Sequence, residues 1–356
     1  AAWRQLRPAQ RRALGESHRN ILAFARSSLR RDWSAKNRQG ATVGERFAPL
    51  RRVGVYVPGG TAPLVSTALM TCTFAAAAGV PEIVAASPPG PDGRLDRALL
   101  AALQRAGANE VYAVGGAQAI GALAFGTASI PAVAKIFGPG NAYVVEAKRQ
   151  VYGFAAIDLL PGPSEVLVVA DGTANPAWVA ADLLAQAEHG AGSTVGLLAT
   201  SGKLIEAVRR EIERQLAGLS RGAHLRPVLD NHAFLIQVKS LAHAIELANA
   251  FAPEHLSLAL REPRRAARRI TTAGAIFLGH FSPVAAGDFM AGPSHELPTG
   301  GAGKAFSGLG AEMFQNRTSL VEFNRAALAR ALPVIDAFAE IEGLDAHGRS
   351  AAIRLE

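Results

Sequence analysis

The stretch Val53-Gly54-Val55-Tyr56-Val57-Pro58-Gly59-Gly60 shows the pattern on which the chain is built. Its first five residues are apolar and β-prone, which is typical of a short strand buried on both faces. The Pro-Gly-Gly that follows ends the strand in a tight turn. The next 19 residues, 62–80, carry no charge. With a strand on either side, they predict a helix buried in an α/β layer.

The same strand, turn and helix recur along the chain. Further apolar strands are expected at 83–86, 111–114, 133–137, 166–170, 195–199, 234–238, 256–260 and 275–278. Strands that alternate with helices specify βαβ units and parallel sheets. Two successive runs predict an α/β protein with two Rossmann-like parallel-sheet domains. The expected parts are a helical N-terminal arm at 1–50, a first domain at 51–165, a second at 166–315 and a helical C-terminal tail at 316–356.

Composition narrows the class of protein. The net charge of +8 suits acidic substrates, a negatively charged cofactor or nucleic acid. The basic residues are mostly Arg without regular aromatic interleaving, so a solvated surface is favoured over nucleic-acid binding. The uncharged helix contains Pro63 and several hydroxyl groups, so no membrane partner is expected. The single cysteine, Cys72, excludes an intrachain disulfide and favours a reducing compartment, the cytoplasm.

Two pairs of residues in the second run carry possible chemistry. Gln186 and His189 are three residues apart at the end of a helix expected at about 175–189, so they share a face. An imidazole and an amide oxygen make half of a Zn²⁺ site, and a polar helix end is the alternative. Glu254 and His255 are adjacent just before a strand. They suit general bases if both face one cleft, and a solvated loop pair otherwise.

Two later segments also combine acidic and imidazole groups. Asp288 and His295 lie in a loop rich in Gly and Pro, where they suit ligands, bases or turn formers. Glu342 and His347 lie near the C-terminus, where a surface helix end is the alternative. None of the Gly-rich turns matches Gly-x-Gly-x-x-Gly, so any dinucleotide is expected to bind in a non-standard way.

Taken together, these segments resemble the histidinol dehydrogenase family from about Arg52 to the C-terminus. The resemblance rests on collinear segments in the expected order, namely 55–60, 114–120, 137–141, 162–165, 186–189, 253–256, 287–295, 297–299 and 342–347. It implies two Rossmann-like domains and the oxidation of L-histidinol to L-histidine through histidinaldehyde, the last step of histidine biosynthesis. It further implies one Zn²⁺ per subunit and two NAD⁺ used in succession.

The resemblance also implies roles for individual residues. His255 is the implied base for hydride transfer, and Glu254 is the implied activator of water. The implied metal ligands are Gln186, His189, Asp288 and His347. The implied substrate contacts are these four ligands with Ser164, His255, His295 and Glu342. The implied cofactor contacts are Tyr56, Gln118 and Asn141, each expected at a strand exit of the first domain.

The family is a homodimer in which the C-terminal segment of one subunit completes its partner's site, which implies that Glu342 and His347 act in trans. The chain departs from the family pattern at Ala134, Pro161 and Asn316, none of them a proposed ligand or base. One alternative is a paralogous zinc- and NAD-dependent dehydrogenase of another small amino alcohol or diol. A second is a catalytically silent binding protein with the same fold, and a nucleic-acid binder is a distant third.

Overall fold

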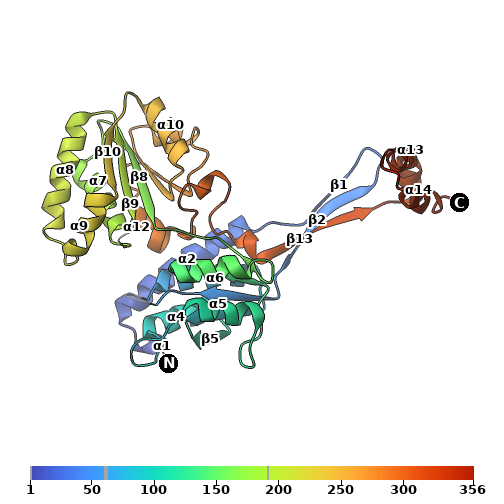
Figure 1. Ribbon diagram of the computed structural model, residues 1–356, viewed down its shortest axis with the longest axis horizontal. Coiled ribbons are helices and arrows are strands. Elements are labelled where there is room, and N and C mark those ends of the chain that lie inside the picture. Colours follow the sequence, from blue (N-terminus) through green and yellow to red (C-terminus); the bar gives the residue numbers. More distant parts are fainter. Residues whose placement is uncertain (1, 60–62, 191) are drawn as a thin grey trace. The chain divides into compact units, whose positions relative to one another are not determined.

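A computed structural model describes residues 2–59, 63–190 and 192–356 (Figure 1). The chain forms two compact units. The first comprises Ala1–Ser28 and Arg51–Phe314, and the second comprises Leu29–Leu50 and Gln315–Glu356. The first unit contains two five-stranded sheets, and the second contains one three-stranded sheet.

The first sheet of unit 1 is parallel and has the strand order β5-β4-β3-β6-β7. Its strands are β3 (Arg52–Tyr56), β4 (Glu82–Ser87), β5 (Glu110–Ala113), β6 (Lys135–Phe137) and β7 (Ala156–Ile157). The helices between them are α3 (Val65–Ala77), α4 (Arg97–Ala106), α5 (Gly116–Phe125) and α6 (Ala142–Val151). α3 packs against α4 and α5 packs against α6, as in a doubly wound sheet.

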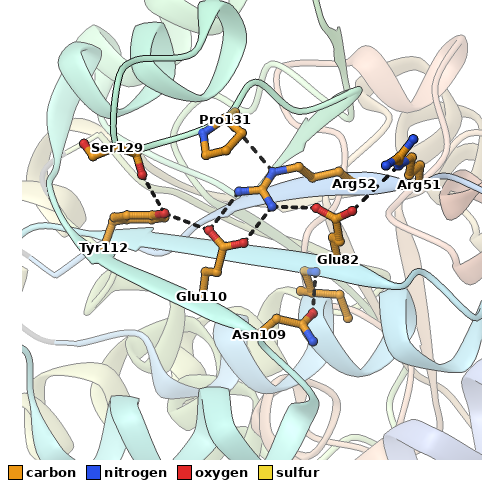
Figure 2. Close-up of polar contacts among 9 residues, drawn as sticks. Arg51, Arg52, Glu82, Asn109, Glu110, Tyr112, Ser129 and Pro131 are labelled. Atoms are coloured by element: carbon orange, nitrogen blue, oxygen red, sulfur yellow. Dashed lines mark hydrogen bonds and ion pairs between the residues drawn. The ribbon is translucent and has the colours of Figure 1, made fainter.

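The amino ends of three neighbouring strands are joined by ionic hydrogen bonds (Figure 2). Arg52, the first residue of β3, donates to Glu82 at 2.7 Å and to both oxygens of Glu110 at 2.7 and 2.8 Å. Glu82 and Glu110 are the first residues of β4 and β5. The Tyr112 hydroxyl also donates to Glu110, at 2.7 Å. A planar guanidinium can serve two carboxylates at once, so one side chain links all three strands.

The second sheet of unit 1 is also parallel, with the order β10-β9-β8-β11-β12. Its strands are β8 (Glu165–Ala170), β9 (Thr194–Ala199), β10 (Ala233–Gln237), β11 (His255–Ala259) and β12 (Ala275–Leu278). Its helices are α7 (Pro176–Ala187), α8 (Gly202–Leu216), α9 (Gly222–Asn231), α10 (Leu241–Phe251) and α11 (Pro263–Ala267). Successive residues of β8 enter two different cores, so helices cover both faces. The two predicted Rossmann-like sheets are therefore confirmed.

Four short elements complete the second half of unit 1. They are α12 (Val284–Ala286), the π-helix η1 (Gly287–Ala291), and the 3₁₀ turns η2 (Ala302–Lys304) and η3 (Ala311–Phe314). The π-helix carries Asp288, and Gly292 directly after it has φ +116°. π-helical turns are rare and occur mostly at functional sites, which makes this loop a candidate.

The predicted helical arm at 1–50 is correct only in its first part. α1 (Ala2–Gln5) and α2 (Pro8–Ser28) are helices, and α2 packs on α3 through buried Ile21 and Ala25. Beyond them the chain forms β1 (Trp33–Lys36) and β2 (Thr42–Pro49). β1 is exposed throughout and β2 is mostly half-buried, so neither strand shows the alternation of buried and exposed residues by which strands are recognised.

Unit 2 is built on an antiparallel sheet of order β1-β2-β13, in which β13 spans Gln315–Glu322. The prediction of a wholly helical segment at 316–356 is thus wrong for its first residues, which pair with β2 along their whole length. The rest is helical as expected, in α13 (Arg325–Glu342) and α14 (Asp345–Ala352). The buried positions of these helices are small residues such as Ala327, Ala331 and Ala351.

The uncharged segment predicted as a buried helix is α3, within which residues 67–75 are buried. Cys72 lies there as a free, buried thiol, and burial raises its pKa. Among the described residues, no helix combines the length and the apolarity needed to cross a membrane.

Candidate active site

The candidate catalytic residues meet at the amino ends of two paired strands. Glu165 and His255 are the first residues of β8 and β11, with Ser164 and Glu254 one position before each. These strands are parallel neighbours, with His255 opposite Val166. Because parallel strands in register begin at the same edge of a sheet, residues about 90 positions apart in the chain come together here.

Glu165 and Glu254 hold each other in place. The Glu165 N–H donates to Glu254 Oε2 at 2.7 Å, and the Glu254 N–H donates to Glu165 Oε2 at 3.3 Å. Glu165 Oε1 also accepts from the Gly300 N–H at 3.1 Å. Both carboxyl groups are buried, and burial raises the pKa of Glu165. Glu165 was not predicted as a site residue, because only the register of β8 against β11 brings it to Glu254.

His255 is buried between three acceptor groups. Its Nδ1 lies 3.0 Å from the Glu165 carbonyl oxygen and 3.4 Å from Glu254 Oε2. A carbonyl can only accept, so Nδ1 carries the proton and the lone pair of the neutral ring is on Nε2. Nε2 lies 3.6 Å from Asp288 Oδ1. Burial lowers the pKa of His255, but Asp288 and Glu254 outweigh it and raise that pKa to about 10.

Two of the predicted metal ligands of unit 1, His189 and Asp288, lie near this group, and Gln186 precedes His189 by three residues. α7 ends at Ala187, so Gln186 is in its last turn and His189 follows in the next, where its N–H donates to the Gln186 carbonyl at 3.2 Å. His189 Nδ1 lies 3.3 Å from Ser164 Oγ. Burial favours a higher pKa for Asp288, yet His255, His295 and His189 together lower it. Asp288 therefore interacts electrostatically with three imidazoles, as expected for a residue at the centre of a polar cluster.

The geometry and donor set can be tested against the implied zinc ion. Gln186 is 1% exposed, and its Nε2 has no hydrogen-bond partner among the described residues. A buried amide without a partner is costly, and the cost disappears if a ligand lies beside it. Turning the amide over exchanges its oxygen and nitrogen, so Gln186 can offer an oxygen to a cation. With one imidazole and one carboxylate, this set fits Zn²⁺ as three of four ligands.

No three His, Cys, Asp or Glu side chains in the described part of the chain are grouped as a metal site. The predicted set has only two such side chains in unit 1, His189 and Asp288, since its third ligand there is the Gln186 amide. A further ligand, His347, belongs to unit 2, where it lies exposed in α14. Glu342, the last residue of α13, is exposed in the same unit. The structure thus places His189 and Asp288 near His255, while Glu342 and His347 belong to a separate compact unit.

His295 and its neighbour Glu296 are held by two threonines of α3. His295 Nε2 lies 2.9 Å from Thr67 Oγ1, and Thr71 one turn later donates to the buried Glu296 carboxyl. Burial lowers the pKa of His295, which favours the neutral ring. The α3 helix therefore orients the predicted substrate contact through its hydroxyl-bearing face.

The predicted cofactor contacts lie at the carboxyl ends of β3, β5 and β6. Tyr56 ends β3 and is buried, and its hydroxyl accepts the Gly116 N–H at 3.1 Å. Gln118 and Asn141 are exposed near the starts of α5 and α6. Asn141 caps α6, with its Oδ1 accepting from Tyr143 N and Val144 N, both at 3.1 Å.

The turn after β6 packs closely against the end of β3. Gly138 has φ +111°, and a Cβ added there would lie 2.0 Å from the Tyr56 carbonyl oxygen. A Cβ on Gly116 would lie 2.8 Å from Gln118 Oε1. Glycines let the backbone come close, and helix N-termini at the carboxyl edge of a parallel sheet attract phosphates. The edge therefore fits a dinucleotide, although it lacks Gly-x-Gly-x-x-Gly.

Known histidinol dehydrogenases are similar to this chain over nearly its whole length. The sequence model described as histidinol dehydrogenase matches residues 1–355. Histidinol dehydrogenase of Synechococcus sp. is 46% identical over 99% of this chain and 82% of its own length. That of Gloeobacter violaceus is 44% identical over 100% and 80%.

Solved structures show that the fold is similar as well. The crystal structure of histidinol dehydrogenase from Elizabethkingia anophelis superposes with a TM-score of 0.97 at 38% identity, covering 99% of this chain and 82% of that one. An acetylating aldehyde dehydrogenase from Geobacillus thermoglucosidasius shares only the fold, at a TM-score of 0.56 and 16% identity over 89% of this chain and 84% of that one. This chain belongs to the histidinol dehydrogenase family.

Proposed function

We propose that this chain is a zinc-dependent, NAD-linked dehydrogenase that oxidises L-histidinol to L-histidine through L-histidinaldehyde. The observation that carries the proposal is the meeting of Glu254, His255 and Asp288 at one strand edge, with Ser164 and His189 in contact beside them. The names of the relatives support the substrate. A reducing compartment, the cytoplasm, is the proposed location, in keeping with the free Cys72.

In the first step, His255 removes the hydroxyl proton of the substrate. In the neutral ring Nε2 holds the lone pair, since Nδ1–H faces the Glu165 carbonyl, and a cation bound at Asp288 would offset the negative charge that raises the pKa of His255. As the O–H bond breaks, the hydrogen on the same carbon leaves with its electron pair to NAD⁺, giving the aldehyde and NADH. The positive charge left on the ring is stabilised by Glu254, 3.4 Å from Nδ1.

In the second step, Glu254 takes a proton from water as the water oxygen bonds to the aldehyde carbon. Its Oε2 is occupied by the Glu165 N–H, so Oε1 is the oxygen assigned to the water. As the water adds, His255 returns its proton to the aldehyde oxygen, which gives the hydrate and restores the neutral ring. The hydrate then loses a hydride to a second NAD⁺ and a proton to His255, which gives the acid. Two NADH per histidinol balance the four electrons removed.

Gln186, His189 and Asp288 are the unit 1 residues proposed to hold Zn²⁺, with His347 from a second copy as the fourth ligand. When bound, the ion would hold the substrate's amine and imidazole and draw the Asp288 charge away from His255. Ser164 and His295 are the proposed substrate contacts of unit 1, and Glu342 is that of the second copy. Tyr56, Gln118 and Asn141 are the proposed contacts of NAD.

A homodimer is proposed because unit 2 presents apolar side chains to solvent. Val321, Phe338 and Ile341 are exposed by 67%, 58% and 77%. Large exposed apolar side chains on a unit whose buried helical positions are mostly Ala mark an interface. The same unit carries Glu342 and His347, so a partner seated on it would receive both residues.

The reaction is tested by counting NADH formed per L-histidinol with metal-loaded enzyme. Two NADH per substrate are expected. No turnover of histidinol, or turnover only of another amino alcohol or diol, would overturn the proposed substrate. His255→Asn is expected to abolish most turnover while histidinol still binds, as measured by calorimetry. If turnover survives that change, the assignment of the base is wrong.

The trans arrangement is tested by mixing two inactive variants, His255→Asn and His347→Ala. A hybrid dimer has one site with both residues intact only if His347 acts across the interface. Random mixing should then restore about a quarter of the parent's activity. If His347 acts within its own chain, both sites of the hybrid are defective and no activity returns.

A further inference from the structure

The first domain contains a buried ion pair outside the groups assigned so far. Lys148 of α6 and Asp158 just after β7 form a salt bridge, and their side chains are 0% and 2% exposed. Neither residue belongs to the strand-end turns that carry the proposed cofactor contacts. The pair nevertheless forms hydrogen bonds with one of those turns, the turn after β6 that contains Gly138.

Both charged groups bind the backbone of the same residue, Gly138. Lys148 Nζ donates to the Gly138 carbonyl oxygen at 2.8 Å, and the Gly138 N–H donates to Asp158 Oδ2 at 2.7 Å. Each of these bonds has an ionised partner, which makes it stronger than a neutral hydrogen bond. The two polar backbone groups of Gly138 are thus fixed at once by a single ion pair.

Gly138 lies at a point where a small movement would affect two of the three proposed cofactor contacts, Tyr56 and Asn141. It has φ +111° and lies against the backbone of Tyr56 so closely that a Cβ would be 2.0 Å from the Tyr56 oxygen. Three residues further on, Asn141 uses its Oδ1 to cap α6, which leaves its amide nitrogen as a donor. The turn between them contains Gly140, where a Cβ would lie 2.3 Å from Val144.

Stability alone is a poor explanation for such a pair. Removing two charges from water is costly, and apolar residues of similar volume often stabilise a fold as well or better. Lys148 and Asp158 form specific bonds that an apolar pair could not supply, and both bonds go to the turn. We propose that Lys148 and Asp158 are positioning residues for dinucleotide binding, which hold the Gly138 turn, and with it Tyr56 and Asn141, in the binding conformation. The inference rests on the proposed function.

The test replaces both charges together, in Lys148→Met/Asp158→Leu, so that no buried charge is left unpaired. The full-length double variant is expected to keep its melting temperature within a few degrees. Its Kd for NADH, measured by the fluorescence of NADH without substrate, should rise about tenfold. KM for NAD⁺ should rise in parallel, while KM for histidinol stays within about twofold. Hydrogen exchange of residues 136–144 should become faster.

The matched control is Arg149→Met, the next residue of α6, which is exposed and paired with Glu146. Its Kd for NADH should equal the parent's. A folded double variant with the parent's Kd and exchange rates overturns the inference, and a parent that binds no NADH overturns the proposed function instead. If the double variant does not fold, Asp158→Asn decides by the same readouts. Its weaker acceptor should raise the Kd several-fold, and an unchanged Kd rejects the inference.

Discussion

Glu165 and Glu254 each accept a hydrogen bond from the backbone N–H of the other, at 3.3 and 2.7 Å. The residues are 89 positions apart; Glu165 begins β8, and Glu254 immediately precedes its parallel neighbour β11. The exchange fixes the carboxyl group that we assign to water activation, and it joins the two strand starts. Glu165 thereby influences the site through Glu254, without being assigned to the substrate.

Glu165→Gln should slow the aldehyde step more than the alcohol step. The amide nitrogen of Gln would meet either the Glu254 N–H or the Gly300 N–H, so one acceptor bond is lost and Glu254 is less well held. We expect kcat from histidinaldehyde to fall roughly ten- to a hundredfold, with a smaller effect on the first hydride transfer. Stopped-flow NADH formation from each substrate measures both steps. An equal loss in both would mean that Glu165 is only structural.

Zinc should stabilise the folded chain, and the effect should depend on Gln186, His189 and Asp288. At a free metal concentration a hundred times Kd, linkage contributes about 2.7 kcal/mol. Thermal unfolding with zinc and with a chelator should show this difference in the parent. The shift should largely vanish in Asp288→Asn. In His295→Ala it should remain, since that residue is assigned to substrate, and its loss there would show that His295 is a ligand.

The hydrogen bonds that Glu110 accepts from Arg52 and Tyr112 predict a contribution to the stability of the fold at acid pH. Hydrogen bonds from Arg52 and then Tyr112 lower the pKa of Glu110 from 4.5 to about 2. A carboxyl with a lowered pKa stabilises the fold above its unfolded pKa, and the contribution is lost as the pH falls from about 4.5 to about 2. Glu110→Gln should therefore make denaturant stability less dependent on pH in this window. The effect is limited because the carboxyl is partly solvated.

The control for this prediction is Glu262→Gln, which removes an exposed carboxylate paired with Arg265 on the surface. It should leave the pH profile as in the parent. An identical profile for Glu110→Gln and the parent would show that Arg52 and Glu110 do not interact appreciably in solution.

The buried carboxyl of Glu296 should have the opposite effect, so that the stability of the fold decreases as the pH rises. Burial, and then the charge of Asp158, raise the pKa of this carboxyl to about 8, against the weaker influence of Thr71 and Lys148. For a raised pKa, the stabilisation is complete below the ordinary value of 4.5 and is lost as the pH rises through about 8. Glu296→Gln keeps a neutral group there. It should be more stable than the parent at pH 9 by at least about 1 kcal/mol.

Urea unfolding at pH 4 and pH 9 checks this. At pH 4 the variant and the parent should differ little, since the carboxyl is mostly neutral in both the folded and the unfolded state. A variant that is less stable than the parent at both values would mean that Glu296 is ionised in the fold and paired there.

The alternation of apolar strands with Gly-rich turns sufficed to predict two parallel sheets, because a strand buried on both faces is visible as an apolar run. The antiparallel strands β1, β2 and β13 were not predicted, since β1 and β13 are mostly exposed, β2 is mostly half-buried, and none of them alternates between buried and exposed residues. Collinear motifs identified the candidate ligands and bases. The register of β11 against β8 then placed Glu254 and His255 beside Glu165, and the π-helix η1 carries the Asp288 that lies next to His255.

Glu165, Lys148 and Asp158 could not be found in the same way. Charged residues in a helix or at a strand start have the same local pattern whether they are solvated or buried. Their partners are set by long-range packing: β8 against β11 for Glu165, and α6 against the end of β7 for Lys148. Local preferences depend on neighbours within a few positions, whereas the desolvation that makes these groups bind specific backbone atoms exists only after the sheets have formed.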